Sequence, residues 1–324
     1  MNSRLLGRTG QKVSEIGFGA WGIGKSWWGK TDDTESLRSL RRAIELGVTF
    51  FDTAYVYGDG HSEQLIHQAF RETRGRYFVA TKCPPKNMGW PADPRTPLKE
   101  AFPEDWMTSC TERSLQNLGT DCLDLQQFHV WTDAWVDQDE WKNTVAKLKK
   151  QGKIRWFGVS INDLDPDSAL QLVESGLVDT VQVIYNIFEQ APAKSLFPLC
   201  QKMNVGVIVR VPLDEGGLSG TLTPQTKFEK EDFRSNYFAE GRLAETCARV
   251  EKLKPLLESY APTIPELALK FILGHPAVSV VIPGMRRVKN VEINTRISGS
   301  APLPKDVLQE LKKHAWKRTR HPIV

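Results

Sequence analysis

The sequence has few cysteines, and their spacing does not suggest a metal site or a disulfide framework. The five cysteines are Cys83, Cys110, Cys122, Cys200 and Cys247. Their number is odd and none forms a C-x-x-C pair, which argues against a disulfide-stabilised secreted fold and favours a reducing compartment. Residues 1–17 also lack the apolar core of a secretion signal, so we expect a cytoplasmic protein.

Long apolar runs and a large net charge are missing as well. No run approaches the roughly 18 apolar residues of a membrane-spanning helix, so no membrane partner is expected. The formal net charge of +4 is too small to predict nucleic-acid binding, and the basic segment 313–324 has the composition of a solvated tail. His, Asp and Glu do not cluster at metal-ligand spacing, so we expect no metal. The sequence carries no signal for an oligomeric state.

Eight short apolar runs alternate with longer amphipathic segments. The runs lie at 14–21, 48–54, 77–83, 123–130, 154–161, 180–187, 205–213 and 278–284. Nearly continuous apolar runs of this length are typical of parallel strands that are buried on both faces. Several of the amphipathic segments end at a glycine, as 33–47 does at Gly47 and 103–119 at Gly119. This alternation predicts an α/β fold, a (β/α)8 TIM barrel that forms a single domain over residues 1–324.

Three segments lie outside the alternation. Residues 3–10 contain a turn and are predicted to form an N-terminal hairpin that closes the barrel floor. Residues 213–242 form a long, polar, Gly-rich segment, and such loops are usually either functional or disordered. A helix is predicted at 304–313, near the end of the chain.

Ionisable residues follow three consecutive predicted strands, at the end where barrels place their active sites. Asp52 and Tyr57 follow the second strand, Lys82 ends the third and His129 ends the fourth. Each residue alone has an ordinary structural explanation, such as a turn, packing or solvation. Together, at neighbouring strand ends, they predict a shared catalytic site.

The chemistry of these four residues suggests proton transfer to a carbonyl. A free Tyr phenol has a pKa of about 10, which is high for an acid–base group at neutral pH. A nearby ammonium group lowers that pKa. We therefore expect Lys82, held by Asp52, to lower the pKa of Tyr57, while His129 orients a substrate oxygen.

These segments resemble the motifs of the aldo-keto reductases over nearly the whole chain. FFDTAYVYGDGHSE at 50–63 is similar to the family's Asp-x4-Tyr-Gly signature, VATKC at 79–83 to its lysine strand and LDLQQFH at 123–129 to its histidine strand. GKIRWFGVS at 152–160 and VVIPGMR at 280–286 resemble its cofactor motifs. The resemblance implies hydride transfer from NADPH to the carbonyl of an aldehyde or ketone, or the reverse alcohol oxidation, with Tyr57 as general acid.

The resemblance also implies where the nicotinamide lies. Ser160 and Gln182 match residues that hold its carboxamide. The Asn that often follows this Ser is replaced by Ile161, and Asn162 comes one position later, so either position can lie at the amide. Arg210 stands where many members have a stacking aromatic residue. It either stacks on the nicotinamide or forms an internal salt bridge.

The other end of the cofactor is expected beyond the eighth strand. Arg286 offers a forked pair of donors to the 2′-phosphate of NADPH, and the helix that follows adds backbone amides. Arg287 and Lys289 are expected to be solvated, and the 213–242 segment to fold over the pyrophosphate. The full expected cofactor-binding set is Gly19, Trp21, Asp52, Ser160, Asn162, Gln182, Arg210, Pro212, Leu213, Gly217, Leu218, Gly284, Met285, Arg286, Asn290 and Asn294.

Tryptophans gather in the predicted loops beside the site. Six of the 10 are Trp21, Trp27, Trp28, Trp90, Trp131 and Trp135. An aromatic rim favours apolar or aromatic carbonyl compounds as substrates. The expected substrate contacts are Trp21, Trp28, Tyr57, Trp90, His129 and Trp131.

Other functions remain possible for a barrel of this kind. The main alternative is a non-catalytic NADPH-binding barrel that acts as a sensor or regulatory subunit, although the complete set of four ionisable residues argues against it. A lyase or isomerase is a second alternative. A metal-dependent hydrolase is disfavoured because no ligand cluster is apparent.

Overall fold

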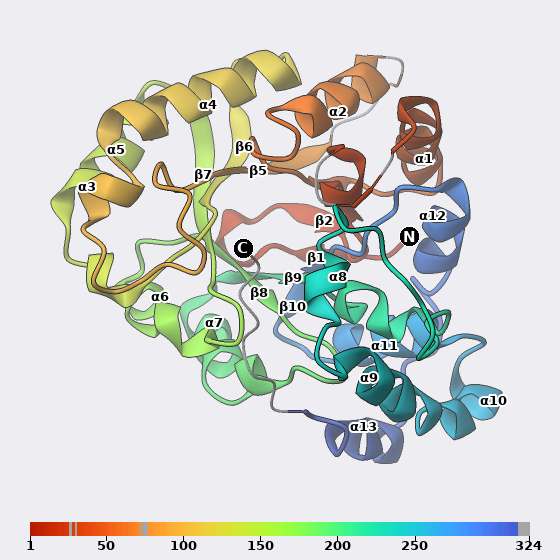
Figure 1. Ribbon diagram of the computed structural model, residues 1–324. Helices are drawn as coiled ribbons and strands as arrows, with labels where there is room; N and C mark the ends of the chain where they lie inside the picture. Colours follow the sequence, from red (N-terminus) through yellow and green to blue (C-terminus); the bar gives the residue numbers. More distant parts are fainter. Residues whose placement is uncertain (26–27, 30, 72, 74–76, 317–324) are drawn as a thin grey trace.

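The computed structural model describes residues 1–25, 28–29, 31–71, 73 and 77–316, and its centre is a sheet of eight parallel strands (Figure 1). The strands are β3 Phe18–Gly19, β4 Phe50–Asp52, β5 Phe78–Cys83, β6 Leu123–Phe128, β7 Ile154–Ser160, β8 Thr180–Ile184, β9 Gly206–Arg210 and β10 Val278–Val281. They pair in sequence order, and parallel bridges from Ile16 to Val281 and from Gly19 to Gly284 join the two ends of the sheet. The predicted barrel is confirmed. Its strands are shorter than the apolar runs because the run ends continue into loops.

A two-stranded antiparallel hairpin, β1 Ser3–Leu5 and β2 Lys12–Ser14, precedes the barrel. Leu6 and Val13 are buried in the cluster that also contains Phe50 and Phe78. The Arg4 guanidinium donates a hydrogen bond of 3.1 Å to the Val278 carbonyl at the start of β10. The hairpin therefore closes the end of the barrel where the strands begin, as predicted.

Helices surround the sheet (Figure 1). They are α1 Asp33–Glu45, α2 His61–Arg71, α3 Leu98–Ala101, α4 Glu104–Leu118, α5 Asp139–Lys150, α6 Leu170–Ser175, α7 Leu196–Met203, α8 Arg234–Tyr237, α9 Arg242–Glu251, α10 Leu257–Tyr260, α11 Ile264–Leu273, α12 Val288–Thr295 and α13 Lys305–Lys312. Their ends follow local sequence signals. The Asp32 carboxylate accepts a hydrogen bond from the Thr34 amide at the start of α1, and Gly119 takes a left-handed conformation at the end of α4. The helix predicted at 304–313 is α13.

Apolar side chains fill the part of the barrel where the strands begin, and polar side chains follow nearer to the ends of the strands. Alternate residues of a strand face the same side, so Phe50 and Asp52 share the inner face of β4, as Ala80 and Lys82 do on β5. Phe50 and Ala80 belong to the buried inner cluster with Leu125, Ile208 and Val280. The polar residues two positions later therefore rest on a packed floor at the end where the strands stop.

The long segment after β9 is ordered by contacts with the loop after β3. It contains a short 3-10 stretch, η6 Asp214–Ser219, and helix α8, which lies in front of the barrel in Figure 1. The Phe233 ring lies 4.8 Å from the Trp21 ring and 5.1 Å from the Trp28 ring, measured between centroids. The segment therefore crosses the ends of the strands and packs against the loop after β3.

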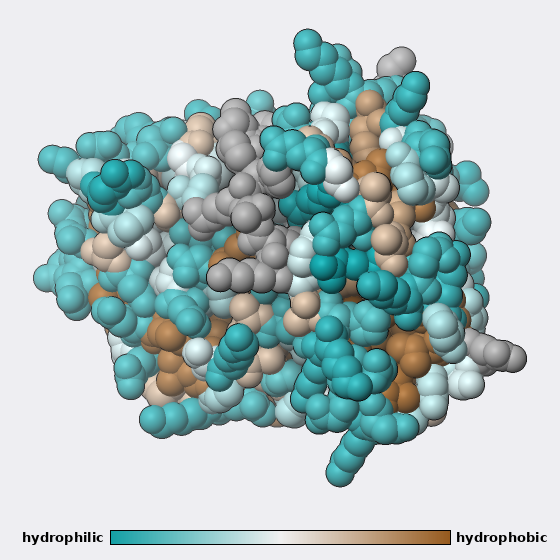
Figure 2. Space-filling view, turned by 60° about the horizontal axis from the view of Figure 1, so that its bottom comes forward, coloured by the Kyte–Doolittle hydropathy of each residue, from teal (hydrophilic) through white to brown (hydrophobic). Residues whose placement is uncertain are grey.

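None of the described helices is long and apolar enough to span a bilayer. Figure 2 shows a mostly hydrophilic face on which apolar side chains form separate patches.

Candidate active site

A buried ion pair forms the base of the site. Lys82 Nζ lies 2.6 Å from Asp52 Oδ1 and donates a second hydrogen bond of 2.7 Å to the Thr53 carbonyl. The other carboxylate oxygen of Asp52 accepts a hydrogen bond of 2.6 Å from Gln182 Nε2. Burial raises the pKa of Asp52 and lowers the pKa of Lys82, and their mutual attraction opposes both shifts. The pair joins β4 to β5, and Gln182 holds it from β8.

Tyr57 lies directly over this pair. Its hydroxyl oxygen is 3.4 Å from Lys82 Nζ, and the ammonium group lies 5.1 Å from the centroid of the Tyr57 ring. The backbone that carries Tyr57 is pressed against the loop after β3. Gly58 has φ +68°, and a Cβ there would come within 2.1 Å of the Gly24 carbonyl oxygen. Close backbone packing therefore fixes the position of the phenol.

The electrostatics correct one expectation about Tyr57. Burial raises the pKa of Tyr57 well above its ordinary value, and the Asp52 carboxylate raises it further, while the Arg210 guanidinium opposes the rise. The pKa lowering expected from Lys82 is therefore wrong for this structure, because desolvation of the phenolate is the larger effect. The phenol stays protonated at neutral pH and is available as a proton donor.

His129 completes the set as a neutral hydrogen-bonding group. Its ring lies 5.7 Å from the Tyr57 ring, edge to face. Burial lowers the pKa of His129 well below its ordinary value, and the positive charges of Lys82 and Arg210 act in the same direction. Nδ1 is buried with no hydrogen-bond partner in the described part of the chain. A neutral imidazole beside the phenol can orient a carbonyl oxygen without competing as a charge.

Several of the predicted aromatic residues do form a rim around these groups. Trp21 stacks 6.2 Å from Tyr57, Trp28 packs 5.4 Å from Trp21, and Trp90 lies 5.6 Å from the His129 ring. Trp90 is 38% exposed, so part of its ring is free to meet a ligand. Trp27 lies outside the described residues.

Trp131 is a correction to the predicted substrate contacts. It is fully buried and packs against Phe128, Trp135 and Trp141 at centroid distances of 6.4, 6.0 and 5.4 Å. Its indole nitrogen donates to Asp133 Oδ1 at 3.0 Å. Loop tryptophans that follow a strand can turn back onto the helix layer, and spacing alone did not distinguish this residue from Trp90.

The strand ends of β7 and β9 differ from what the sequence suggested. Asn162 pairs with the backbone of Ala92 through both ends of its side-chain amide, at 3.0 Å each. Arg210 forms an ion pair of 2.5 Å with Asp163 and donates to the Ile161 carbonyl at 2.9 Å. The internal salt bridge that the sequence left open for Arg210 is therefore present. Ser160 is buried at the end of β7, and the register places it opposite Gln182 of β8.

Arg286 and Asn294 lie beyond β10, where the resemblance predicts the adenosine end of the cofactor. Arg286 is half-buried, and its guanidinium donates to the Trp28 carbonyl at 2.7 Å. Burial and the charges of Arg234 and Arg287 lower the pKa of Arg286, and the Asp232 carboxylate, which pairs with Arg234, opposes the shift. Asn294 is buried, and its Nδ2 has no hydrogen-bond partner within the described residues. A cluster of cations and a buried, unpaired donor suit an anionic group and a polar base.

The other predicted cofactor residues surround the same strand ends. Gly19 pairs with Gly284 across the barrel closure, and a Cβ on Gly284 would meet nothing within 4 Å. Pro212, Gly217, Leu218 and Met285 are buried, whereas Leu213 and Asn290 are half-buried. The fully buried side chains of Leu218 and Met285 would present only backbone to a ligand.

Sequence reasoning missed four residues at this rim: Asp163, Glu215, Phe233 and Arg234. Asp163 and Glu215 follow strands β7 and β9, so the strand-end rule that selected Asp52 could have found them. Burial raises the pKa of Glu215 to about 8, with the Asp163 carboxylate adding to the rise. Phe233 and Arg234 belong to the long segment, where no spacing rule assigns a position; Arg234 lies 4.8 Å from the Trp28 ring.

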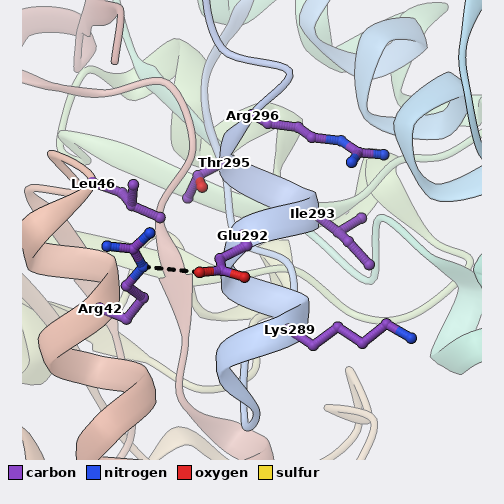
Figure 3. A pocket seen from close by; sticks show the side chains of 7 residues that line it. All are labelled: Arg42, Leu46, Lys289, Glu292, Ile293, Thr295 and Arg296. Carbon is purple, nitrogen blue, oxygen red and sulfur yellow. Dashed lines mark hydrogen bonds and ion pairs between the residues drawn. The ribbon is translucent and has the colours of Figure 1, made fainter.

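A surface cavity of about 540 Å³ lies between α1 and α12, away from these strand ends (Figure 3). It is lined by Arg42, Leu46, Lys289, Glu292, Ile293, Thr295 and Arg296. Arg42 donates to Glu292 at 3.1 Å across it, and Lys289 and Arg296 point away from Arg42. None of the four predicted catalytic residues lines this cavity, so we place no chemistry there.

The chain thus folds as a (β/α)8 barrel with a buried cluster of ionisable residues at the rim where its strands end. The chain belongs to the aldo/keto reductase family, whose model matches residues 15–315. It is 31% identical over 306 residues to aldo-keto reductase YhdN of Bacillus subtilis (strain 168), covering 92% of this chain and 89% of the relative. It is 30% identical over 305 residues to the NADH-specific methylglyoxal reductase of Escherichia coli (strain K12), covering 89% of this chain and 91% of the relative.

The fold comparison agrees with the family assignment. The holo form of aldo-keto reductase AKR11C1 from Bacillus halodurans superposes with a TM-score of 0.78 at 26% identity, covering 100% of this chain and 99% of the other. The chain is therefore an NAD(P)-dependent oxidoreductase that acts on carbonyl compounds, and the family expectation from the sequence is confirmed.

Proposed function

We propose that the chain is an NADPH-dependent reductase of aldehydes or ketones whose general acid is Tyr57. One observation carries the proposal: the Tyr57 hydroxyl lies 3.4 Å from an ammonium group that is itself held 2.6 Å from a buried carboxylate. This arrangement presents a protonated phenol at the mouth of the barrel, above a buried ion pair that hydrogen bonds to Thr53 and Gln182 hold in place. It suits proton donation to an oxygen that gains negative charge.

Each residue of the cluster has a separate role in that reaction. His129 orients the substrate carbonyl toward the phenol by a hydrogen bond from its neutral ring. Tyr57 gives its proton to the carbonyl oxygen as charge develops there. Lys82 stabilises the phenolate that remains, and Asp52 keeps Lys82 charged and in place. NADPH, when bound, supplies the hydride.

The preference for NADPH over NADH rests on Arg286. Its guanidinium offers two parallel donors to the 2′-phosphate on the adenosine ribose of NADPH. NADH has no phosphate at that position. Family membership does not decide this point, because the relative from Escherichia coli is described as NADH-specific. The residues that would hold the dinucleotide are Gly19, Trp21, Ser160, Gln182, Arg210, Pro212, Leu213, Gly217, Leu218, Gly284, Met285, Arg286, Asn290 and Asn294.

The aromatic rim supports apolar or aromatic carbonyl compounds as substrates. Trp21, Trp28 and Trp90 surround the phenol and imidazole with flat apolar surface.

We further propose that residues 1–324 act as one domain in the cytoplasm, with no nucleic-acid or membrane partner.

The test is turnover by the purified protein. We expect NADPH absorbance to fall when an aromatic aldehyde is added, and the reaction to be much slower with NADH at equal concentration. NADPH binding without turnover on a broad panel of aldehydes and ketones would instead identify a non-catalytic barrel. Faster turnover with NADH would overturn the cofactor assignment and leave the reaction class standing.

A further inference from the structure

Asn162 makes an unusual connection between two loops of the site. Its Oδ1 accepts a hydrogen bond of 3.0 Å from the Ala92 amide, and its Nδ2 donates one of 3.0 Å to the Ala92 carbonyl. Both residues are 7% exposed, and they are 70 positions apart in the chain. The side-chain amide thus pairs with one residue of backbone as a neighbouring strand would.

The pairing with Ala92 uses both ends of the Asn162 side-chain amide. Turning the amide toward a nicotinamide would leave the buried N–H and C=O of Ala92 without partners, which is unfavourable. The preceding residue does not substitute for it, because the Ile161 side chain is 1% exposed and its carbonyl accepts from Arg210. Of the residues predicted to lie at the nicotinamide carboxamide, Ser160 and Gln182 then remain.

The segment that Asn162 holds carries Trp90. The segment 84–97 is anchored near each end by an indole: Trp106 Nε1 donates to the Pro84 carbonyl at 2.8 Å, and Trp135 Nε1 to the Thr96 carbonyl at 2.9 Å. Ala92 lies between these anchors, two residues after Trp90. The Trp90 ring packs edge-on against His129 at 5.6 Å.

We infer that Asn162 is a positioning residue for substrate recognition: through Ala92 it holds the Trp90 ring beside His129, where the ring meets the apolar part of a carbonyl substrate. The inference rests on the proposed reductase function. It assigns Asn162 to the substrate side, in place of the nicotinamide contact that the sequence suggested. Without the anchor the segment would have to be ordered again when substrate binds, which weakens binding and leaves the proton donor intact.

The kinetic test compares Asn162→Leu with Asn143→Leu, the same change at an exposed position of α5. Benzaldehyde and propanal serve as probes with and without a ring. We expect Asn162→Leu to raise KM for benzaldehyde by about tenfold, a change of roughly 1.4 kcal/mol. KM for propanal, kcat for both aldehydes and Kd for NADPH should change less than about twofold, the precision of such comparisons. Asn143→Leu should behave as the wild type.

A second readout does not depend on activity. Lys86 and Arg95 are exposed trypsin sites on the segment, and the Arg95 side chain is 89% exposed. Trypsin should cut Asn162→Leu at these sites faster than it cuts the wild type or Asn143→Leu. If Asn162→Leu folds poorly, Asn162→Asp keeps the acceptor for the Ala92 amide and should show the same changes at smaller size.

The double variant Asn162→Leu/Trp90→Ala separates an effect through Trp90 from a direct one. If Asn162 acts through Trp90, the double variant should have the same KM for benzaldehyde as Trp90→Ala alone. Weaker NADPH binding by Asn162→Leu would overturn the inference and favour a contact between Asn162 and the nicotinamide. An equal rise in KM for both aldehydes with unchanged trypsin cleavage would overturn it as well. A wild type without turnover would refute the reductase proposal, while the trypsin comparison would still decide whether Asn162 holds the segment.

Discussion

The two halves of the barrel rim use their polar residues differently. In the first half, at the ends of β4, β5 and β6, the site residues contact one another: Lys82 contacts Asp52 at 2.6 Å and Tyr57 at 3.4 Å. In the second half, which runs from the end of β7 to the end of β10, they contact residues outside the predicted site: Asn162 pairs with Ala92 and Arg210 with Asp163. In the first half, residue type and spacing therefore predict which residues come together. In the second half the contacts of a residue depend on which loop folds back onto the strand end.

Tyr57→Phe tests the first half and should give the largest effect. The substitution keeps the ring that stacks near Trp21 and removes the hydroxyl that lies 3.4 Å from Lys82 Nζ. We expect kcat for an aldehyde to fall by about 10²-fold or more, with NADPH binding unchanged. Tyr260→Phe, a phenol on α10, is the matched control and should remain fully active. A Tyr57→Phe enzyme that keeps most of its kcat would exclude Tyr57 as the acid.

Lys82→Met tests whether the buried pair acts through Tyr57. Removing the ammonium leaves the Asp52 carboxylate buried without its charge partner, which typically costs about 3–5 kcal/mol of stability. We expect at least a tenfold loss of kcat, about 1.4 kcal/mol in the barrier, and a shifted pH–rate profile. Lys149→Met, which breaks the 2.9 Å ion pair with Asp179, should lower the melting temperature without moving that profile. An unshifted profile at full activity would remove Lys82 from the mechanism.

The same contrast explains what the sequence could and could not predict. The eight strands and Asp52, Tyr57, Lys82 and His129 follow from apolar runs and the residues that end them, because strand ends of a parallel barrel must meet at one rim. That residues 1–324 form one domain stays a prediction. The burial of Trp131 and the Asn162–Ala92 pairing could not be predicted, because they depend on how loops pack. The high pKa of Tyr57 follows from desolvation, which a list of neighbouring charges omits.

Arg286→Ala tests the cofactor end of the second half and should have an intermediate effect. A charge-assisted hydrogen bond is worth about 1.5–3 kcal/mol, so NADPH affinity should fall roughly ten- to a hundredfold. NADH affinity should stay nearly constant, since NADH has no 2′-phosphate. Tryptophan quenching during titration with each cofactor measures both values. Arg155→Ala, at the opposite end of the barrel on β7, is the control. Equal losses for the two cofactors would mean that Arg286 only supports the Trp28 loop, whose carbonyl it contacts at 2.7 Å.

Glu215→Gln tests the electrostatics of the second half and should have the smallest effect. Glu215 lies in a backbone segment with positive φ, at 53° for both Asp214 and Glu215. Burial raises its pKa from the ordinary 4.5 to about 8, so the folded protein favours the neutral acid. The stabilisation from this group is complete below pH 4.5 and is lost as the pH rises through about 8.

A neutral Gln does not titrate, so the variant should gain melting temperature relative to the wild type as the pH rises. We expect a difference of a few degrees above pH 8 that shrinks below pH 4.5, measured by thermal melts of the cofactor-free protein. Glu100→Gln, an exposed carboxyl on α3, should follow the wild type at every pH. Parallel stability curves for Glu215→Gln and the wild type would show that Glu215 ionises freely.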